Sequence, residues 1–203
     1  MTAKIKLNAA SGGGSFSLQA PSSSSNARVM TLPDTADGTI LTTTNPKAGN
    51  ILQVVSTTKT DTFSTSAYQT FTDITGLSVS ITNTGSNKVL LQGVLSISGS
   101  ADTFAVARLV RTTSGSDTAI FIGDASSSRS RATFGLYFEG NVELNVNGFT
   151  FLDTPSAGTH TYKIQVYRGE GGSELFVNRS SDGTDSVRSG MVVSSITVSE
   201  VAA

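Results

Sequence analysis

The sequence has no cysteine, no tryptophan and a single histidine. Without cysteine the chain cannot form a disulfide framework, a thiolate zinc site or a cysteine nucleophile. The single histidine, His160, excludes zinc sites that need two or more histidine ligands. We therefore expect no metal, no cofactor and no catalytic residues, because nothing else in the sequence matches a catalytic signature.

Charge is also scarce: 14% of the residues are charged, and 14 Lys+Arg against 15 Asp+Glu leave a net charge of -1. Binding to nucleic acid or to an anionic membrane surface needs clustered lysine and arginine. No apolar run approaches the roughly 18 residues of a membrane span, and the first residues lack the basic and apolar regions of a signal peptide. We expect neither a nucleic-acid partner nor a membrane partner.

Small polar residues are abundant instead: 31 serines, 28 threonines and 20 glycines make up 79 of the 203 positions. Threonine, valine, isoleucine and phenylalanine favour β-strands, and strong helix formers are few. A chain rich in serine and threonine can also be a disordered stalk. Regular alternation and 37% hydrophobic residues argue against disorder beyond residue 50, and less strongly before it. The sequence predicts an all-β protein.

The pattern changes near Pro46. Residues 1–46 contain short apolar alternations set among small polar residues, too few to bury a core of their own. We predict that 1–46 form an N-terminal β-arm that needs a partner, which is copies of itself with which it intertwines, the downstream domain or another protein, followed by a head domain at 47–203. The apolar residues expected to contact a partner are Ile5, Leu7, Phe16, Leu18, Val29, Leu32 and Ile40.

From Gly49 onward the sequence predicts about ten strands separated by turn signals, the spacing of two packed antiparallel sheets. We prefer a jelly-roll-like β-sandwich to an immunoglobulin-type sandwich, because of the strand number and the absence of cysteine and tryptophan. The expected strands are 51–56, 68–74, 77–82, 88–98, 103–111, 118–122, 133–139, 142–151, 159–167, 175–177 and 191–201.

Several expected strands carry apolar residues on both faces, which in an antiparallel sheet requires a cover for the second face. This feature favours an oligomer, although irregular alternation would give the same pattern. The residues concerned are Leu90, Val94, Leu109, Phe121, Tyr137, Tyr167, Phe176 and Val193.

Enzymatic and metal chemistry have little support. His160 lies where a strand begins, and no nucleophile-elbow sequence accompanies it, so we interpret it as a structural or surface histidine. Two dispersed carboxylates could meet across strands as in a glycosidase, and a carbohydrate-active enzyme is the alternative from this class. The segment 182–185 resembles part of a calcium loop but lacks the alternating ligands.

Two polar loops are the candidate receptor-contact sites. The first, 124–131, carries Arg129 and Arg131 among serines; the second, 178–188, carries Arg179, Asp182 and Arg188. Arginine beside serine, asparagine and aspartate suits hydrogen bonding to sugars or carboxylates, although the simpler interpretation of both segments is a solvated loop.

Several strings resemble proteins of phage particles. Residues 2–45, with KIKLNAASGGGS at 4–15 and VMTLPD at 29–34, resemble a module of tail-fibre and other virion proteins of marine phages, including cyanophages. ILQVVSTTKT at 51–60, GTHTY at 158–162 and SSITVSEV at 194–201 look like parts of the head domain in the same kind of protein.

The resemblance implies a homotrimer located in the virion and assembled in the cytoplasm of a bacterial host. Residues 1–46 would bind other virion proteins, and the jelly-roll head would bind a glycan or protein on the host surface. No repetitive shaft separates the two parts, so the expectation is a short tail fibre or knob. The alternative is a capsid decoration or cement protein that stabilises the head shell.

Overall fold

The computed structural model describes residues 4–19, 22–25 and 46–203. The chain divides into two units, Met1–Ile40 and Leu41–Ala203. The boundary expected at residue 46 stays a prediction, because residues 26–45 lie outside the described residues. Val29, Leu32 and Ile40 lie there too, as does the side chain of Phe16.

The N-terminal unit contains an antiparallel hairpin of β1 (Lys4–Asn8) and β2 (Ser15–Gln19). Its turn contains Gly12 and Gly13 at φ +83° and +71°, a conformation that glycine adopts without steric cost. Ile5 lies opposite Leu18, and all three described apolar contact residues of this hairpin, Ile5, Leu7 and Leu18, are exposed. A lone two-stranded hairpin is marginally stable in water, and the partner expected for it stays a prediction.

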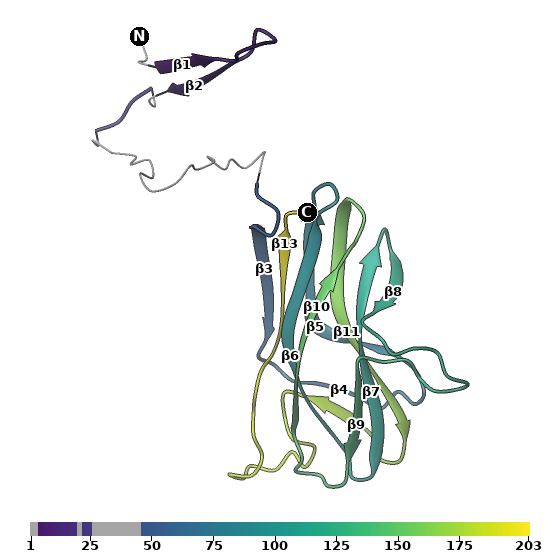
Figure 1. The fold of residues 1–203 in the computed structure, drawn as a ribbon. Coiled ribbons are helices and arrows are strands. Elements are labelled where there is room, and N and C mark those ends of the chain that lie inside the picture. Colours follow the sequence, from purple (N-terminus) through teal and green to yellow (C-terminus); the bar gives the residue numbers. More distant parts are fainter. Residues whose placement is uncertain (1–3, 20–21, 26–45) are drawn as a thin grey trace, which may run out of the picture. The chain divides into compact units, whose positions relative to one another are not determined.

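The larger unit is an antiparallel β-sandwich (Figure 1). Its first sheet consists of β3 (Ile51–Lys59), β4 (Phe63–Thr65), β6 (Lys88–Gly99), β10 (Asn145–Asp153), β12 (Leu175–Val177) and β13 (Ser194–Val201). Its second sheet consists of β5 (Thr72–Asn83), β7 (Thr103–Thr113), β8 (Ser116–Ile120), β9 (Phe134–Phe138) and β11 (Gly158–Glu170).

The strand pairing identifies a jelly roll. In the first sheet, β6 pairs with β10 along one edge and with β13 and then β12 along the other, while β3 and β4 pair with β13 and β12. The first sheet therefore has four rows in the order β3/β4, β13/β12, β6, β10. The second sheet has four rows in the order β5, β11, β7, β8/β9. Eight antiparallel rows in two sheets with these crossovers form the jelly-roll arrangement, which confirms the predicted fold class.

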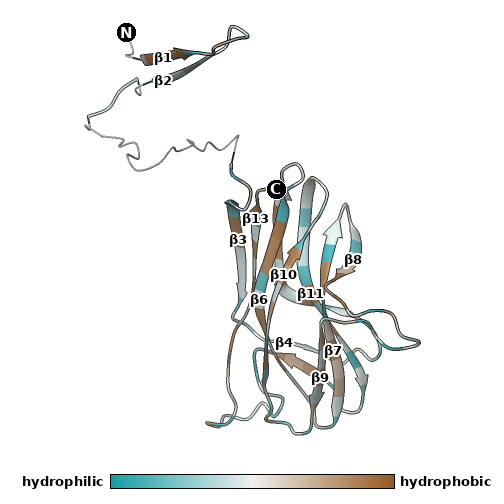
Figure 2. Ribbon diagram, viewed as in Figure 1, coloured by the Kyte–Doolittle hydropathy of each residue, from teal (hydrophilic) through white to brown (hydrophobic). Residues whose placement is uncertain are grey.

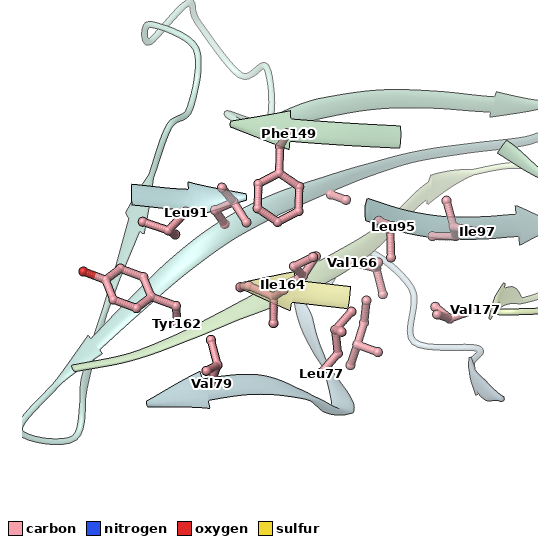
Figure 3. Packing of buried hydrophobic residues seen from close by; sticks show 14 of the residues in the cluster. Leu77, Val79, Leu91, Leu95, Ile97, Phe149, Tyr162, Ile164, Val166 and Val177 are labelled. Carbon is pink, nitrogen blue, oxygen red and sulfur yellow. The ribbon is translucent and has the colours of Figure 1, made fainter. Parts of the chain in front are cut away.

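The core lies between the two sheets and consists of alternate side chains of each strand. Figure 3 shows residues of β5, β6 and β11 directed toward one another across this space. Hydrophobic colour in Figure 2 likewise follows the strands, for example β6 and β10. Burial of these apolar side chains is the main contribution to the stability of the head. The fully buried hydrophobic residues include Leu77, Val89, Leu91, Leu95, Ile97, Leu109, Tyr162, Ile164, Val166, Ile196 and Val198.

Gly93, in β6, marks a close approach of neighbouring strands. A Cβ atom at this position would lie 2.3 Å from the backbone oxygen of Ser195 and 2.6 Å from the ring of Phe149. The absence of a side chain at residue 93 therefore lets the buried Phe149 ring pack over β6.

Most strand ends differ from the prediction by a few residues, and three differences are larger. Segments 68–74 and 77–82 were expected as two strands, but residues 72–83 form one strand, β5. Gly76, at φ +79°, lies at the register shift between β5 and β11 and acts as a bulge, not as a turn. β4 was not predicted, and β10 begins at Asn145 because residues 140–144 form a loop.

The eight residues expected to place apolar side chains on the second face of their strands differ in burial in the single chain. Leu109 and Phe176 are buried, and Leu90, Val94 and Tyr167 are half-buried. Phe121, Tyr137 and Val193 are exposed. Six of the eight therefore keep some surface in contact with solvent in the single chain, and the oligomer inferred from them stays a prediction.

The linker enters the sandwich beside the C-terminus. The amide of Gly49 donates to the carbonyl of Ala202, and the amide of Ala202 donates to the carbonyl of Asn50, both at 2.9 Å. Figure 1 shows residues 46–50 and the C-terminus at one end of the sandwich, and the loop after β12 at the other. Among the described residues, no helix has the length and hydropathy that a membrane span requires.

Candidate functional site

The loop of residues 178–193 interrupts one row of the first sheet, between β12 and β13. The side chain of Asn178 fixes its base: Nδ2 donates to the carbonyls of Lys59 and Asp61, and Oδ1 accepts a hydrogen bond from Ser194. The amide of Val192 donates to the carbonyl of Asn178. The loop is thus closed at its base, and farther out the amide of Asp182 and the hydroxyl of Ser181 both donate to the carbonyl of Asn141.

Asp182 organises this loop. Its carboxylate accepts hydrogen bonds from the hydroxyls of Ser180, Thr184 and Ser189 at 2.8–2.9 Å. The bond from Thr184, together with the others, lowers the pKa of Asp182 below its ordinary value. Its oxygens therefore hold the loop together, and the receptor contact expected of Asp182 stays a prediction.

A polar hollow of about 280 Å³ lies within the 178–193 loop, and Arg179, Asp185 and Ser186 contribute to its wall. The guanidinium of Arg179 also lies 4.2 Å from the centre of the Phe176 ring. Arg188 is exposed. The structure thus gathers Arg179 and Asp182 in one loop, as the sequence indicated.

Arg129 and Arg131 are exposed in the loop between β8 and β9. Arg131 donates from Nε to the carbonyl of Gly123. Figure 1 shows this loop and the 178–193 loop at separate places on the sandwich, so the candidate arginines do not form a single patch.

Two buried polar clusters between the strands are structural. Asp153 accepts hydrogen bonds from Arg111 at 2.6 and 2.8 Å and from the hydroxyl of Tyr162 at 2.8 Å. Burial and the adjacent carboxylate raise the pKa of Tyr162 far above its ordinary value. This tyrosine therefore stays protonated and joins β11 to β10.

His160 is buried and fully hydrogen-bonded. Its Nε2 lies 2.8 Å from the carbonyl of Ser156, and its Nδ1 lies 2.8 Å from the hydroxyl of Thr113. A carbonyl can only accept, so Nε2 carries a proton, and the second hydrogen bond joins Nδ1 and the Thr113 hydroxyl. The interpretation of His160 as a structural residue agrees with this geometry. Within the part of the chain that the structure describes, no three acidic, histidine or cysteine residues gather as metal ligands.

An aromatic groove lies on the outer face of the second sheet, the face directed away from the first sheet. In β7 the small residues Ala105 and Ala107 face the core, so Phe104 and Val106 face outward. Phe104 lies opposite Tyr137 of β9, and Val106 lies opposite Tyr167 of β11. These pairings place three aromatic rings on one surface of three neighbouring strands.

The groove has a volume of about 330 Å³. Phe104 and Tyr167 form parts of its wall, Val106 lies between them, and the glycines at 135 and 169 leave its lining open. Phe104 is 54% exposed, and its ring centre lies 4.4 Å from that of Tyr137, which is 41% exposed.

The surroundings of the groove are polar. The hydroxyl of Tyr137 donates to Asp102, and burial together with this carboxylate raises the pKa of Tyr137. The negative charges of Glu139 and Glu143 also raise the pKa of the Tyr137 hydroxyl. Ser130 lines the groove, so the loop that carries Arg129 and Arg131 borders it. The groove cannot be recognised from the sequence, because its residues are far apart along the chain.

No protein-family model and no curated protein matches the sequence. Among solved structures, the Gt strain of infectious bursal disease virus matches with 14% identity and a TM-score of 0.39, over 93% of this chain and 46% of that chain. The Gx strain matches with 15% identity and a TM-score of 0.31, over 94% and 46%. The chain spans under half the length of these viral proteins, and TM-scores below 0.5 do not establish a shared fold.

Proposed function

We propose that the chain is a non-enzymatic structural protein of a phage particle, a homotrimeric short tail fibre or knob. In this proposal the arm attaches to other virion proteins, and the head binds a receptor on the host surface. The particle is assembled in the cytoplasm of the bacterial host.

The observation that carries the proposal is the jelly-roll head, in which the linker and the 178–193 loop occupy opposite ends. Jelly rolls recur in viral capsid and lectin domains. A fold alone does not define a function, so the resemblance of 2–45 and 51–60 to phage virion proteins supports the assignment independently. Attachment through the linker would direct the loop away from the particle.

The arm supports the trimeric part of the proposal. Ile5 and Leu7 are 63% and 58% exposed in the single chain, and a hairpin of this size needs a partner for stability. Three heads on one fibre would bind a surface multivalently, so weak binding at each site is sufficient.

The test compares particles with and without the protein. We expect particles that lack it to lose adsorption to host cells and to keep their thermal stability. Particles that adsorb normally but release their genome at lower temperature would support the decoration protein instead. Light scattering of the purified chain should give about three times 20.9 kDa, and a monomer would contradict the trimer.

A further inference from the structure

We propose that the aromatic groove of β7, β9 and β11 binds an uncharged saccharide. This inference deepens the receptor-binding part of the proposed function and assigns it to a surface other than the 178–193 loop. It rests on the rings of Phe104 and Tyr167 that line the groove, on the Tyr137 ring packed against Phe104, and on the charges around them.

The groove is preorganised. Its aromatic residues belong to paired strands, the inner strands β7 and β11 and the edge strand β9, and the register Phe104–Tyr137 and Val106–Tyr167 fixes their spacing. Sites on strands are held more precisely than sites on loops. The ligand would therefore meet rings that lose little conformational freedom on binding.

The chemistry of the lining selects the ligand. Phe104 and Val106 are apolar, and the lining residues carry no charge. The apolar face of a sugar ring, with its C–H bonds, can stack on the negative face of an aromatic ring. A phosphate or carboxylate ligand would lose its hydration here without a cation in the lining to replace it.

The rim supplies hydrogen bonds for sugar hydroxyls. Asp102 already accepts from Tyr137, and a carboxylate has about four acceptor positions. Glu139 and Glu143 add negative potential near Tyr137, which disfavours acidic sugars. At the other rim, Ser130 lies between Arg129 and Arg131, which can donate to hydroxyl oxygens.

A second copy related by a two-fold axis is a poorer occupant, because such a contact would place groove against groove and two hollows cannot fill one another. A contact within the proposed trimer would instead place the groove against a different face of the next copy, and the self-association measured below distinguishes that case. Stable interfaces need about 800 Å² of complementary surface on each partner.

The experiment measures binding of neutral gluco-, galacto- and manno-oligosaccharides to the full-length protein by saturation-transfer NMR and calorimetry. We expect millimolar affinity for at least one of them at about 10 mM ligand. Phe104→Ala should weaken this binding at least about tenfold, which corresponds to 1.4 kcal/mol. Phe121→Ala is the matched control, because Phe121 is 45% exposed but lies outside the groove, stacked on Phe151.

A second variant fills the groove without removing a ring. A Cβ atom at Gly135 would have no neighbour within 4 Å, and the same holds at Gly140, outside the groove. Gly135→Val should abolish saccharide binding, and Gly140→Val should leave it unchanged. Both variants should retain the wild-type unfolding midpoint.

Absence of binding to every neutral oligosaccharide would overturn the inference, as would equal binding by wild type and Gly135→Val. If Phe104→Ala instead turns a self-associated protein into smaller species without affecting sugar binding, the groove is a contact between copies and the inference is wrong. Particles that carry Gly135→Val but adsorb normally would refute the groove as the receptor site and leave the virion role standing. The proposed function has its own test: it is wrong if particles that lack the protein adsorb to host cells and resist heat as well as particles that contain it.

Discussion

Replacement of Glu200 by glutamine should destabilise the head in a pH-dependent way. The Glu200 side chain is buried at the end of the sandwich where the linker enters. Its carboxylate accepts hydrogen bonds from the amide and hydroxyl of Thr84 at 2.6 Å each, from Asn87 at 2.8 Å and from Gln53 at 2.6 Å. All these partners donate, so the NH₂ group of a glutamine would face another donor.

The magnitude follows from the pKa of Glu200. Burial alone would raise this pKa, but the hydrogen bonds from Thr84, Asn87 and Gln53 outweigh burial and lower it from 4.5 to about 2. A shift of this size corresponds to about 3 kcal/mol of folding free energy. Because the folded-state pKa is the lower one, this stabilisation is present above pH 4.5 and is lost as the pH falls from 4.5 toward 2.

The assay is urea unfolding of wild type and Glu200→Gln, followed by circular dichroism at about pH 6 and about pH 3. The free energy of unfolding should differ by about 3 kcal/mol at the higher pH and by markedly less at the lower pH. Glu170→Gln, at an exposed residue, is the control and should change neither value. A constant difference between the two proteins at both pH values would refute the reasoning, because the loss would then not depend on the ionised carboxylate.

Two further substitutions test a close backbone contact and a buried hydrogen bond. Gly93→Ala should lower the free energy of unfolding by about 3 kcal/mol, because its Cβ would overlap the backbone oxygen of Ser195. Gly148→Ala is the control: its Cβ would have one neighbour at 4.0 Å, so its urea midpoint should stay near that of the wild type. Tyr162→Phe should cost about 1–3 kcal/mol, because the buried Asp153 loses a hydrogen bond. A thermal midpoint equal to that of wild type would contradict the structural role of the Tyr162 hydroxyl.

The sequence predicted the sheets well where alternation is regular. Leu77, Val79 and Ile81 of β5 alternate with serine and threonine, so both the strand and its buried face can be inferred. Alternation is less informative at glycine. A glycine at residue 76 indicates a turn when only the sequence is considered. In the structure the pairing of β5 with β11 continues on both sides of Gly76, which identifies it as part of a bulge.

The candidate site could be predicted only in part. The arginines at 129, 131, 179 and 188 are identifiable from their polar neighbours, and the structure places them in loops. The groove is different, because its aromatic residues belong to β7, β9 and β11 and meet only through strand register. The alternation pattern indicates that Tyr137 and Tyr167 lie on the face of their strands opposite the core. It does not do so for Phe104, because both faces of β7 are apolar and either could be the buried one.

The position at which the chain enters the head has a mechanical consequence. The linker leads directly into β3, whose ladder with β13 extends from residue 51 to residue 59. If the far end of the head is anchored and the linker is pulled, the tension acts along the axis of β3. The hydrogen bonds of the ladder then share the force in shear and do not open one at a time. A head built in this way resists forced unfolding, which depends on the unfolding rate and not on equilibrium stability.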